Sequence, residues 1–158
     1  MKKISLYSFV IIFIWIGFLI AISFMEAPLK FQADSVTTAI GVEIGKIVFK
    51  ALNSIELLFS IFLLFTLKEM KRSDKKIFIG LLFLFVIVGV QSFYLLPVLD
   101  KYADIVIKGG SSPSNIPHIF YVILEVVKLF LLFYIGYRKL LLYRKNIVEQ
   151  TIKNFEID

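Results

Sequence analysis

Four long apolar runs are the feature that most restricts what this chain of 158 residues can fold into. Each run approaches the roughly 20 residues that a helix needs to cross the hydrocarbon core of a bilayer. No water reaches free backbone groups inside that core, so runs of this length must be helical. The sequence therefore predicts an all-α integral membrane protein, a four-helix bundle in a single transmembrane domain. The predicted spans are residues of about 4–25, 47–67, 77–99 and 117–137, followed by a tail at 138–158.

The composition agrees with a membrane protein and excludes several kinds of chemistry. Hydrophobic residues make up 59% of the chain, whereas soluble domains hold about 45–50%. Cysteine is absent, which excludes disulfides, thiolate metal sites and cysteine-based catalysis. No Walker loop, HExxH or GxSxG pattern occurs, so no catalytic residue is predicted and enzymatic activity stays uncertain.

The net charge of +6 is concentrated in three clusters beside the apolar runs. They lie at Lys2 and Lys3, at residues 68–76 and at residues 138–145. Such clusters are typical of cytoplasmic flanks of membrane helices, and they are too short and too closely tied to helix ends to indicate nucleic-acid binding. We therefore expect a multi-pass protein of the bacterial inner (cytoplasmic) membrane. Its partner is the lipid bilayer, and its N- and C-termini are cytoplasmic.

The helix ends carry their own signals. Asp34 or Ser35 is the expected N-cap of an outward extension of the second span. Pro28 and Pro97 are expected to end or kink the first and third spans. The amphipathic tail is expected to continue the last helix into the cytoplasm.

A weak internal repeat relates the two halves of the chain. A shift of 69 residues superimposes Ser23-Phe24 on Ser92-Phe93, Pro28 on Pro97, Gly41 on Gly110, and Glu56 on Glu125. This pattern indicates two tandem two-helix hairpins. Parallel repeats of this kind are related by an axis along the membrane normal. Glu56 and Glu125 then lie at the same depth, about 18–20 Å from the cytoplasmic flank at 1.5 Å per residue.

Polar residues form one stripe on each of the second and fourth spans. On the fourth span, the helical periodicity places His118, Tyr121, Glu125 and Lys128 on one face. On the second span, the stripe holds Asn53 and Glu56 together with Lys46, Lys50 and Ser60. Intramembrane charges normally face the bundle interior or a wet cavity. The two stripes are therefore expected to face each other.

Two interpretations of the stripes stay open. In the first, Glu56 and Glu125 bind or pass a proton, a cation or a small polar ligand, with Lys128, Asn53, Tyr121 and His118 in support. Carboxyl groups in low-dielectric sites can exchange protons near neutral pH. In the second, Glu125 pairs with Lys128 and Glu56 bonds to Asn53 or to another helix, and the polar groups only fix how the helices pack. The narrow bundle also suggests a homodimer or a partner in a membrane complex, for which the chain would be an accessory subunit.

The stretch "WIGFLIAISFMEAPLKF", Trp15 to Phe31, resembles the opening of a superfamily of small bacterial membrane proteins. The superfamily includes copper-resistance-D-like proteins, HemJ-type protoporphyrinogen oxidases and uncharacterised relatives of transmembrane protein 205. The shared features are a W-x-G pair, a proline-ended first helix and about four spans. The resemblance implies the four-helix architecture and, by analogy to the HemJ type, an alternative function as a haem- or quinone-dependent membrane oxidoreductase.

The chain departs from the superfamily at the residues that would carry such chemistry. HemJ-type enzymes use a histidine in an early helix, whereas His118 is the only histidine here. It is expected either to ligate a haem or metal or, beside Pro117, simply to begin the last helix. The three methionines are scattered, so no metal site is predicted and the cofactor stays open. The uncharacterised branch is the best match.

Overall fold

The computed structural model describes residues 3–67 and 74–155, and all regular structure within them is helical. Most of the basic cluster at 68–76 lies outside the described residues, as do Lys2 and the last three residues of the tail. The elements in chain order are α1 (Lys3–Leu19), η1 (Ile20–Glu26), α2 (Ala27–Leu29), η2 (Lys30–Gln32), α3 (Thr38–Leu67), α4 (Lys75–Val90), η3 (Gln91–Leu95), α5 (Leu96–Ile107) and α6 (Ile116–Phe155).

Four continuous helical stretches are long and apolar enough to cross a membrane. They run over Tyr7–Gln32, Thr38–Thr66, Lys75–Ile107 and Ile116–Glu149. Large apolar side chains point away from the bundle, with Phe93 77% and Phe130 70% exposed. A soluble protein would bury such residues, whereas a bilayer solvates them.

Several helix ends differ from the prediction. The second helix does begin before residue 47, the predicted start of the membrane span, as the expected extension requires. Its cap, however, is Thr37 and not Asp34 or Ser35, because the Thr37 hydroxyl accepts the Ile40 N–H at 3.3 Å. Pro97 does not end the third helix, which continues through α5 to Ile107. Pro28 likewise lies at the start of α2, and one more element, η2, follows before the first stretch ends at Gln32. Proline is tolerated there because the first turn of a helical segment needs no N–H donor.

The two prolines follow the only two π-helical segments of the described chain. The first, η1, precedes Pro28, and the second, η3, precedes Pro97. A π-helical turn shifts the register of the side chains that follow it, and such turns occur often at functional sites. The two segments overlap when the chain is shifted by 69 residues, so the sequence similarity coincides with a shared backbone irregularity.

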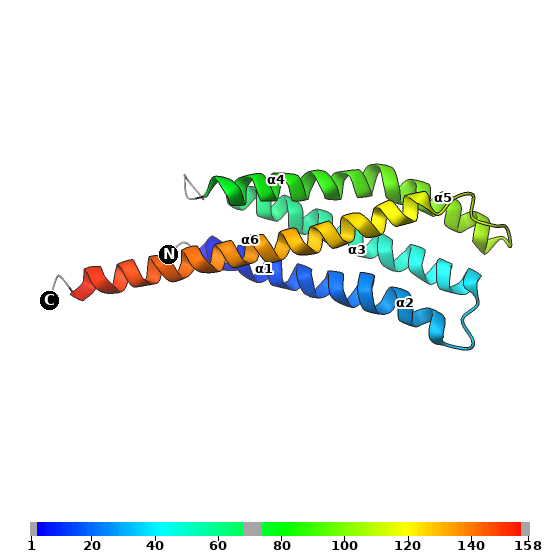
Figure 1. Ribbon diagram of the computed structural model, residues 1–158, viewed down its shortest axis with the longest axis horizontal. Coiled ribbons are helices and arrows are strands. Elements are labelled where there is room, and N and C mark those ends of the chain that lie inside the picture. The colour runs from blue at the N-terminus through cyan, green and yellow to red at the C-terminus, as the bar shows by residue number, and fades with distance from the viewer. Residues whose placement is uncertain (1–2, 68–73, 156–158) are drawn as a thin grey trace.

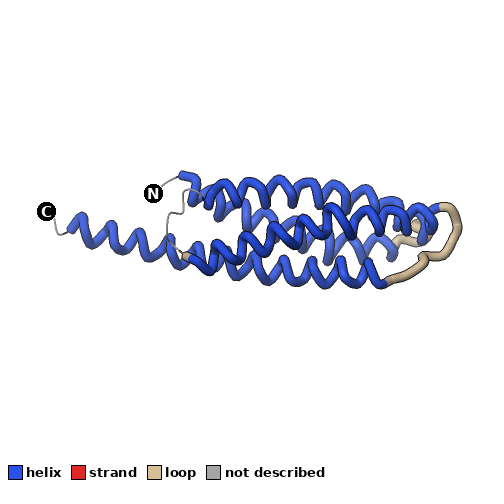
Figure 2. The backbone as a smooth tube through the Cα atoms, turned by 90° about the horizontal axis from the view of Figure 1, so that it is seen from above, coloured by secondary structure: helices blue, strands red, loops and turns tan. Residues whose placement is uncertain are grey.

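The four stretches lie side by side in an elongated bundle (Figure 1). α1 and α4 each pack against both α3 and α6. The links 33–37 and 108–115 lie at one end of the bundle, whereas both ends of the chain lie at the other (Figures 1 and 2). The C-terminal part of α6 continues beyond the other helices, so the amphipathic tail does extend the last helix.

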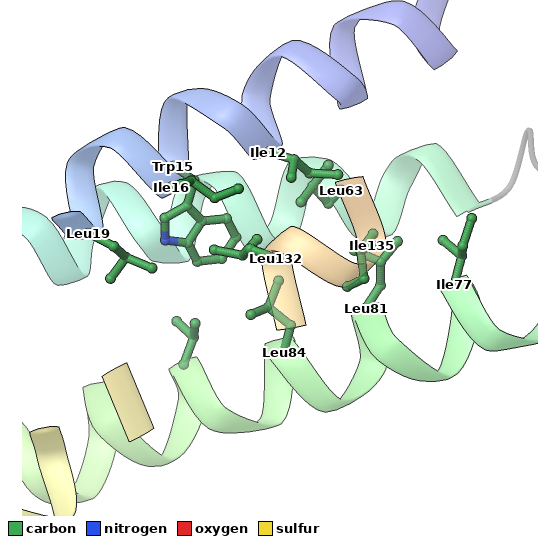
Figure 3. Close-up of a cluster of buried hydrophobic side chains, with 11 residues drawn as sticks. Ile12, Trp15, Ile16, Leu19, Leu63, Ile77, Leu81, Leu84, Leu132 and Ile135 are labelled. Atoms are coloured by element: carbon green, nitrogen blue, oxygen red, sulfur yellow. The ribbon is translucent and has the colours of Figure 1, made fainter. Parts of the chain in front are cut away.

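Two apolar layers fill the interior of the bundle. The layer nearer the chain ends contains Trp15, Leu63 and Leu132 with neighbours from α1 and α4 (Figure 3). The layer nearer the links contains Leu95, Leu96 and Tyr121. On α3 and α6, the residues between these two layers include Glu56, Glu125 and Lys128. The charged residues therefore form a polar layer with apolar packing on both sides.

Candidate functional site

Three charged side chains meet at the centre of the bundle. The Lys128 ammonium lies 2.6 Å from Glu56 Oε1 and 2.8 Å from Glu125 Oε1. All three residues are at most 1% exposed. α3 supplies one carboxylate and α6 supplies both the other carboxylate and the ammonium. The expectation that the two stripes face each other is met at these residues, and Lys128 pairs with both carboxylates rather than with Glu125 alone.

Neutral donors complete the surroundings of the two carboxylates. The Trp15 indole N–H donates to Glu56 Oε1 at 2.9 Å. Glu125 accepts from Gln91 Nε2 at 2.9 Å and from the Ser23 hydroxyl at 3.0 Å. Hydrogen bonds to ionised groups are stronger than those between neutral groups, so these donors stabilise the charge of a buried carboxylate.

The two π-helical segments each direct one donor at the same carboxylate. Ser23 lies in η1 and Gln91 lies in η3. Both side chains reach Glu125, although they belong to different halves of the chain. The π-helical turns of the first and third spans thus each position one hydrogen-bond donor of the central cluster.

Some polar atoms of this layer have no hydrogen-bond partner among the described residues. They are Glu56 Oε2, Asn53 Nδ2, Gln91 Oε1 and the Tyr121 hydroxyl oxygen. Buried polar groups are normally satisfied, and leaving one without a partner costs about 1–3 kcal/mol. The carboxylate and amide oxygens are acceptors, the amide nitrogen is a donor, and the tyrosine hydroxyl can be either. A bound water or a small polar ligand could satisfy such a mixture of donors and acceptors.

The other predicted site residues divide into two groups. Asn53 and Tyr121 are buried, 6% and 3% exposed, and lie one turn from Glu56 and Glu125 on their own helices. Glu56 does not bond to Asn53, because its partners are Trp15 and Lys128. His118 is exposed at the start of α6 and does not join the cluster. Of the six predicted site residues, His118 is therefore the one that the structure places outside the buried polar layer.

The remaining polar residues of the second stripe have local partners or face outward. Lys46 pairs with Asp104 at 2.5 Å, and the Ser60 hydroxyl donates to the Leu57 carbonyl at 2.8 Å. Lys50 is exposed. The polar stripe of α3 thus contributes only its central part to the cluster.

Three members of the cluster are absent from the predicted site. Trp15 is a large, mostly apolar residue in a hydrophobic helix. The only feature that could have predicted its place in the cluster is the indole N–H, which needs an acceptor when it is buried. Gln91 is an uncharged polar residue inside the third apolar run. Ser23 belongs to the repeated SFxxxP pattern, which indicated duplication but not a role.

A comparison with protein-family models, with curated proteins and with solved structures finds no match to this chain. The resemblance to the copper-resistance-D-like superfamily therefore stays an expectation. The function has to be argued from the geometry of the cluster itself.

Proposed function

We propose that the chain is a multi-pass membrane protein whose central cluster takes up a proton, or a small cation in its place, at Glu56. The supporting observation is the difference between the two oxygens of this carboxyl group. Oε1 accepts from Trp15 and Lys128, whereas Oε2 is buried and has no partner among the described residues.

The charge balance of the cluster supports the proposal. Two carboxylates share one ammonium, so the ionised cluster carries one uncompensated negative charge. A net charge in the middle of a bilayer is costly by a few kcal/mol or more. One added proton or monovalent cation makes the cluster neutral, and Glu56 Oε2 is the carboxylate oxygen that offers a free lone pair. Passing the ion onward would make the chain a transporter, as the paired carboxyl groups suggest.

The apolar layers give the cluster its chemical selectivity. Leu63 and Leu132 lie on one side along α3 and α6, and Tyr121 lies on the other. A hydrated ion would have to lose its water to enter between them, whereas a proton can arrive along a transient chain of waters. Protons are therefore the favoured species, and exclusion of bulk water strengthens every electrostatic contact in the cluster.

Fluorescence of Trp15 provides a direct test, because it is the only tryptophan and its N–H donates to Glu56. We expect its emission in lipid nanodiscs to change sigmoidally with pH, and this change to disappear in Glu56→Gln. The matched control is Asp104→Asn, which removes a carboxylate outside the cluster and should keep the change. A separate titration with Na⁺ or K⁺ at fixed pH distinguishes a cation from a proton. Emission that responds to neither would mean that the cluster only holds the helices together.

The orientation is part of the same proposal. We place both chain ends in the cytoplasm and the links 33–37 and 108–115 outside, since the basic clusters favour the cytoplasmic side. The chain has no cysteine, so single-cysteine labelling on intact cells is free of background. A membrane-impermeant thiol reagent should label Ser112→Cys from outside but should not label Lys145→Cys. The opposite pattern would reverse the orientation.

A further inference from the structure

A second charged group is largely covered by its neighbours, two aromatic rings among them, near the link end of the bundle. Lys30 lies in η2, and its side chain is only 10% exposed. Its ammonium lies 5.6 Å from the ring centre of Phe31 and 5.6 Å from that of Phe49. Its only carboxylate partner within residues 3–67 and 74–155 is Glu26, at 3.4 Å. We call Glu26, Phe31, Phe49 and Gly45 the ammonium cage.

Two glycines of α3 make the ammonium cage possible. A Cβ at position 45 would lie 2.9 Å from the Lys30 ammonium, and a Cβ at position 41 would lie 2.2 Å from the Phe31 ring. Gly41, Gly45 and Phe49 follow one another at intervals of four residues, so they lie along one face of α3. The absence of two side chains on this face gives the ring and the ammonium their space.

Two aromatic rings and one carboxylate are the chemistry that binds organic ammonium ions. The negative face of an aromatic ring attracts a cation within about 6 Å, most strongly where water is excluded. An ammonium has three N–H donors, yet Lys30 makes only a long contact with Glu26 inside the ammonium cage. A lysine so placed is held by its surroundings and not by a tight ion pair, which allows another ammonium to replace it.

The ammonium cage also adjoins the buried cluster. The Phe49 ring contacts the Tyr121 ring edge-on, with ring centres 5.8 Å apart. Tyr121 lies one turn from Glu125 on α6 and belongs to the apolar layer nearer the links. Phe49 is therefore a wall shared by the ammonium cage and the layer that covers the central cluster.

We propose that the ammonium cage is a binding site for a small organic ammonium ion, which Lys30 occupies until the ligand displaces it. Lys30 then acts as a tethered competitor, and its removal should expose the site. This inference goes beyond the uptake of a proton at Glu56 and does not require it.

The test restores the missing group with a free molecule. Lys30→Ala removes the part of the side chain beyond Cβ, and n-propylammonium has the same three carbons and nitrogen. In nanodiscs, isothermal titration calorimetry should show that Lys30→Ala binds n-propylammonium at least about tenfold more tightly than the unmodified protein, because the rings and the carboxylate are then free of the competing ammonium. Lys30→Ser, which also clears most of the space beyond Cβ, serves in the same experiment where the alanine variant does not fold, with the same direction expected.

Two controls are matched to the geometry. Adding Gly45→Ala to Lys30→Ala places a methyl group 2.9 Å from the position of the ammonium, which is too close for van der Waals contact. Adding Phe49→Leu instead removes one ring. Each change should reduce or abolish the gain. The neutral analogue 1-propanol should not bind. Equal affinity in the unmodified protein and the lysine variant, or equal binding of 1-propanol, would overturn the proposal. Adding Glu56→Gln to Lys30→Ala should leave n-propylammonium binding intact, so the outcome is separate from that of the proton test.

Discussion

The two glutamates of the central cluster occupy equivalent positions in the two halves of the chain, yet their surroundings differ. Glu125 accepts from Gln91, Ser23 and Lys128, so both of its oxygens have donors. Glu56 accepts from Trp15 and Lys128 through one oxygen only. Under the proposed function this difference gives them different roles: Glu125 would be an anchor that joins the helices, and Glu56 would be the carboxyl that takes up a proton or a cation.

The serines of the repeated SFxxxP pattern show the same asymmetry. Ser23 donates across the bundle to Glu125 Oε2 at 3.0 Å. Ser92, its equivalent after the shift of 69, donates to the Val88 carbonyl of its own helix at 2.7 Å. The contact that would match Ser23 with Glu125 is one between Ser92 and Glu56, and Glu56 Oε2 is the oxygen without a partner. If the two hairpins arose by duplication, one of them has lost this contact.

Removing the cation that both carboxylates share should have the largest effect. Lys128→Met leaves two buried carboxyl groups facing each other without a counter-charge, and breaking a buried ion pair in this way typically costs about 3–5 kcal/mol. We expect a loss of that size in the free energy of unfolding, measured by reversible denaturation in mixed micelles. Lys50→Met, which replaces an exposed lysine of α3, is the control and should change little.

A triple variant shows whether charge or packing causes the loss. Combining Lys128→Met with Glu56→Gln and Glu125→Gln makes the whole cluster neutral, so most of the lost stability should return. Stability that stays low in the triple variant would mean that the length and shape of the Lys128 side chain matter more than its charge.

Replacing each glutamate by leucine compares the two carboxyls directly. Glu125→Leu removes the acceptor of Ser23 and leaves Gln91 Nε2 only its longer bond to the Tyr121 carbonyl, at 3.4 Å. Two weakened donors at about 1–3 kcal/mol each give an expected loss of about 2–4 kcal/mol. Glu56→Leu leaves only Trp15 without an acceptor and should cost about 1–2 kcal/mol. Lys128 keeps one carboxylate in either variant. Equal losses in thermal unfolding of the two variants would contradict the assignment of Glu125 as the anchor.

The equivalent serines permit a smaller but sharper comparison. Ser23→Ala removes a hydrogen bond to a buried carboxylate and should lower the free energy of unfolding by about 1–2 kcal/mol. Ser92→Ala removes only a bond to the carbonyl of its own helix, which contributes little to helix stability, so we expect a change below about 0.5 kcal/mol. Both variants replace serine by alanine and so remove one hydroxyl oxygen each. A larger effect at Ser92 would indicate that it donates to Glu56 in the folded protein.

The sequence predicts the helical class and the central charges well, because both follow from the membrane. Long apolar runs restrict the backbone to helix, and the cost of buried charge requires Glu56, Glu125 and Lys128 to meet in the interior. Which donors surround them depends on the rotation and register of neighbouring helices. The π-helical segments η1 and η3 change that register, and nothing in the composition of residues 20–26 or 91–95 signals a π-helical turn.

The helix ends and His118 show the limits of local signals in the same way. Proline at position 97 predicts the end of a helix, but the π-helical turn before it removes the need for its missing N–H, and the helix continues to Ile107. His118 shares the helical face of Glu125 by periodicity, but it lies about two turns toward the end of the bundle and is exposed. The face of a helix on which a residue lies is predictable from sequence, whereas its position along the bundle and its burial depend on how the helices pack.

The smallest expected effect is that of a substitution at Asp74, at the start of α4 in the second hairpin. The two hairpins are not equivalent at this position. Asp74 caps α4 by accepting the Lys76 N–H at 2.9 Å, and Arg138 of α6 donates to its carboxylate. Position 5, its equivalent, lies inside α1 and not at the start of a helix. Partial burial acts to raise the pKa of Asp74, but the hydrogen bonds from Arg138 and from the backbone outweigh it and leave the pKa below its ordinary value.

This lowered pKa gives the sign of the pH dependence. The stabilisation by Asp74 is present in full above the ordinary aspartate pKa of about 3.9 and is lost as the pH falls toward the lower folded value. Asp74→Asn keeps the cap but loses the ion pair, so we expect a loss of about 0.2–1 kcal/mol at neutral pH. Melting temperatures of the two proteins should begin to converge as the pH falls below about 3.9, and they should coincide only below the lowered pKa of folded Asp74. A difference that persists in acid would mean that Asp74 acts through its shape at the start of α4 and not through its charge.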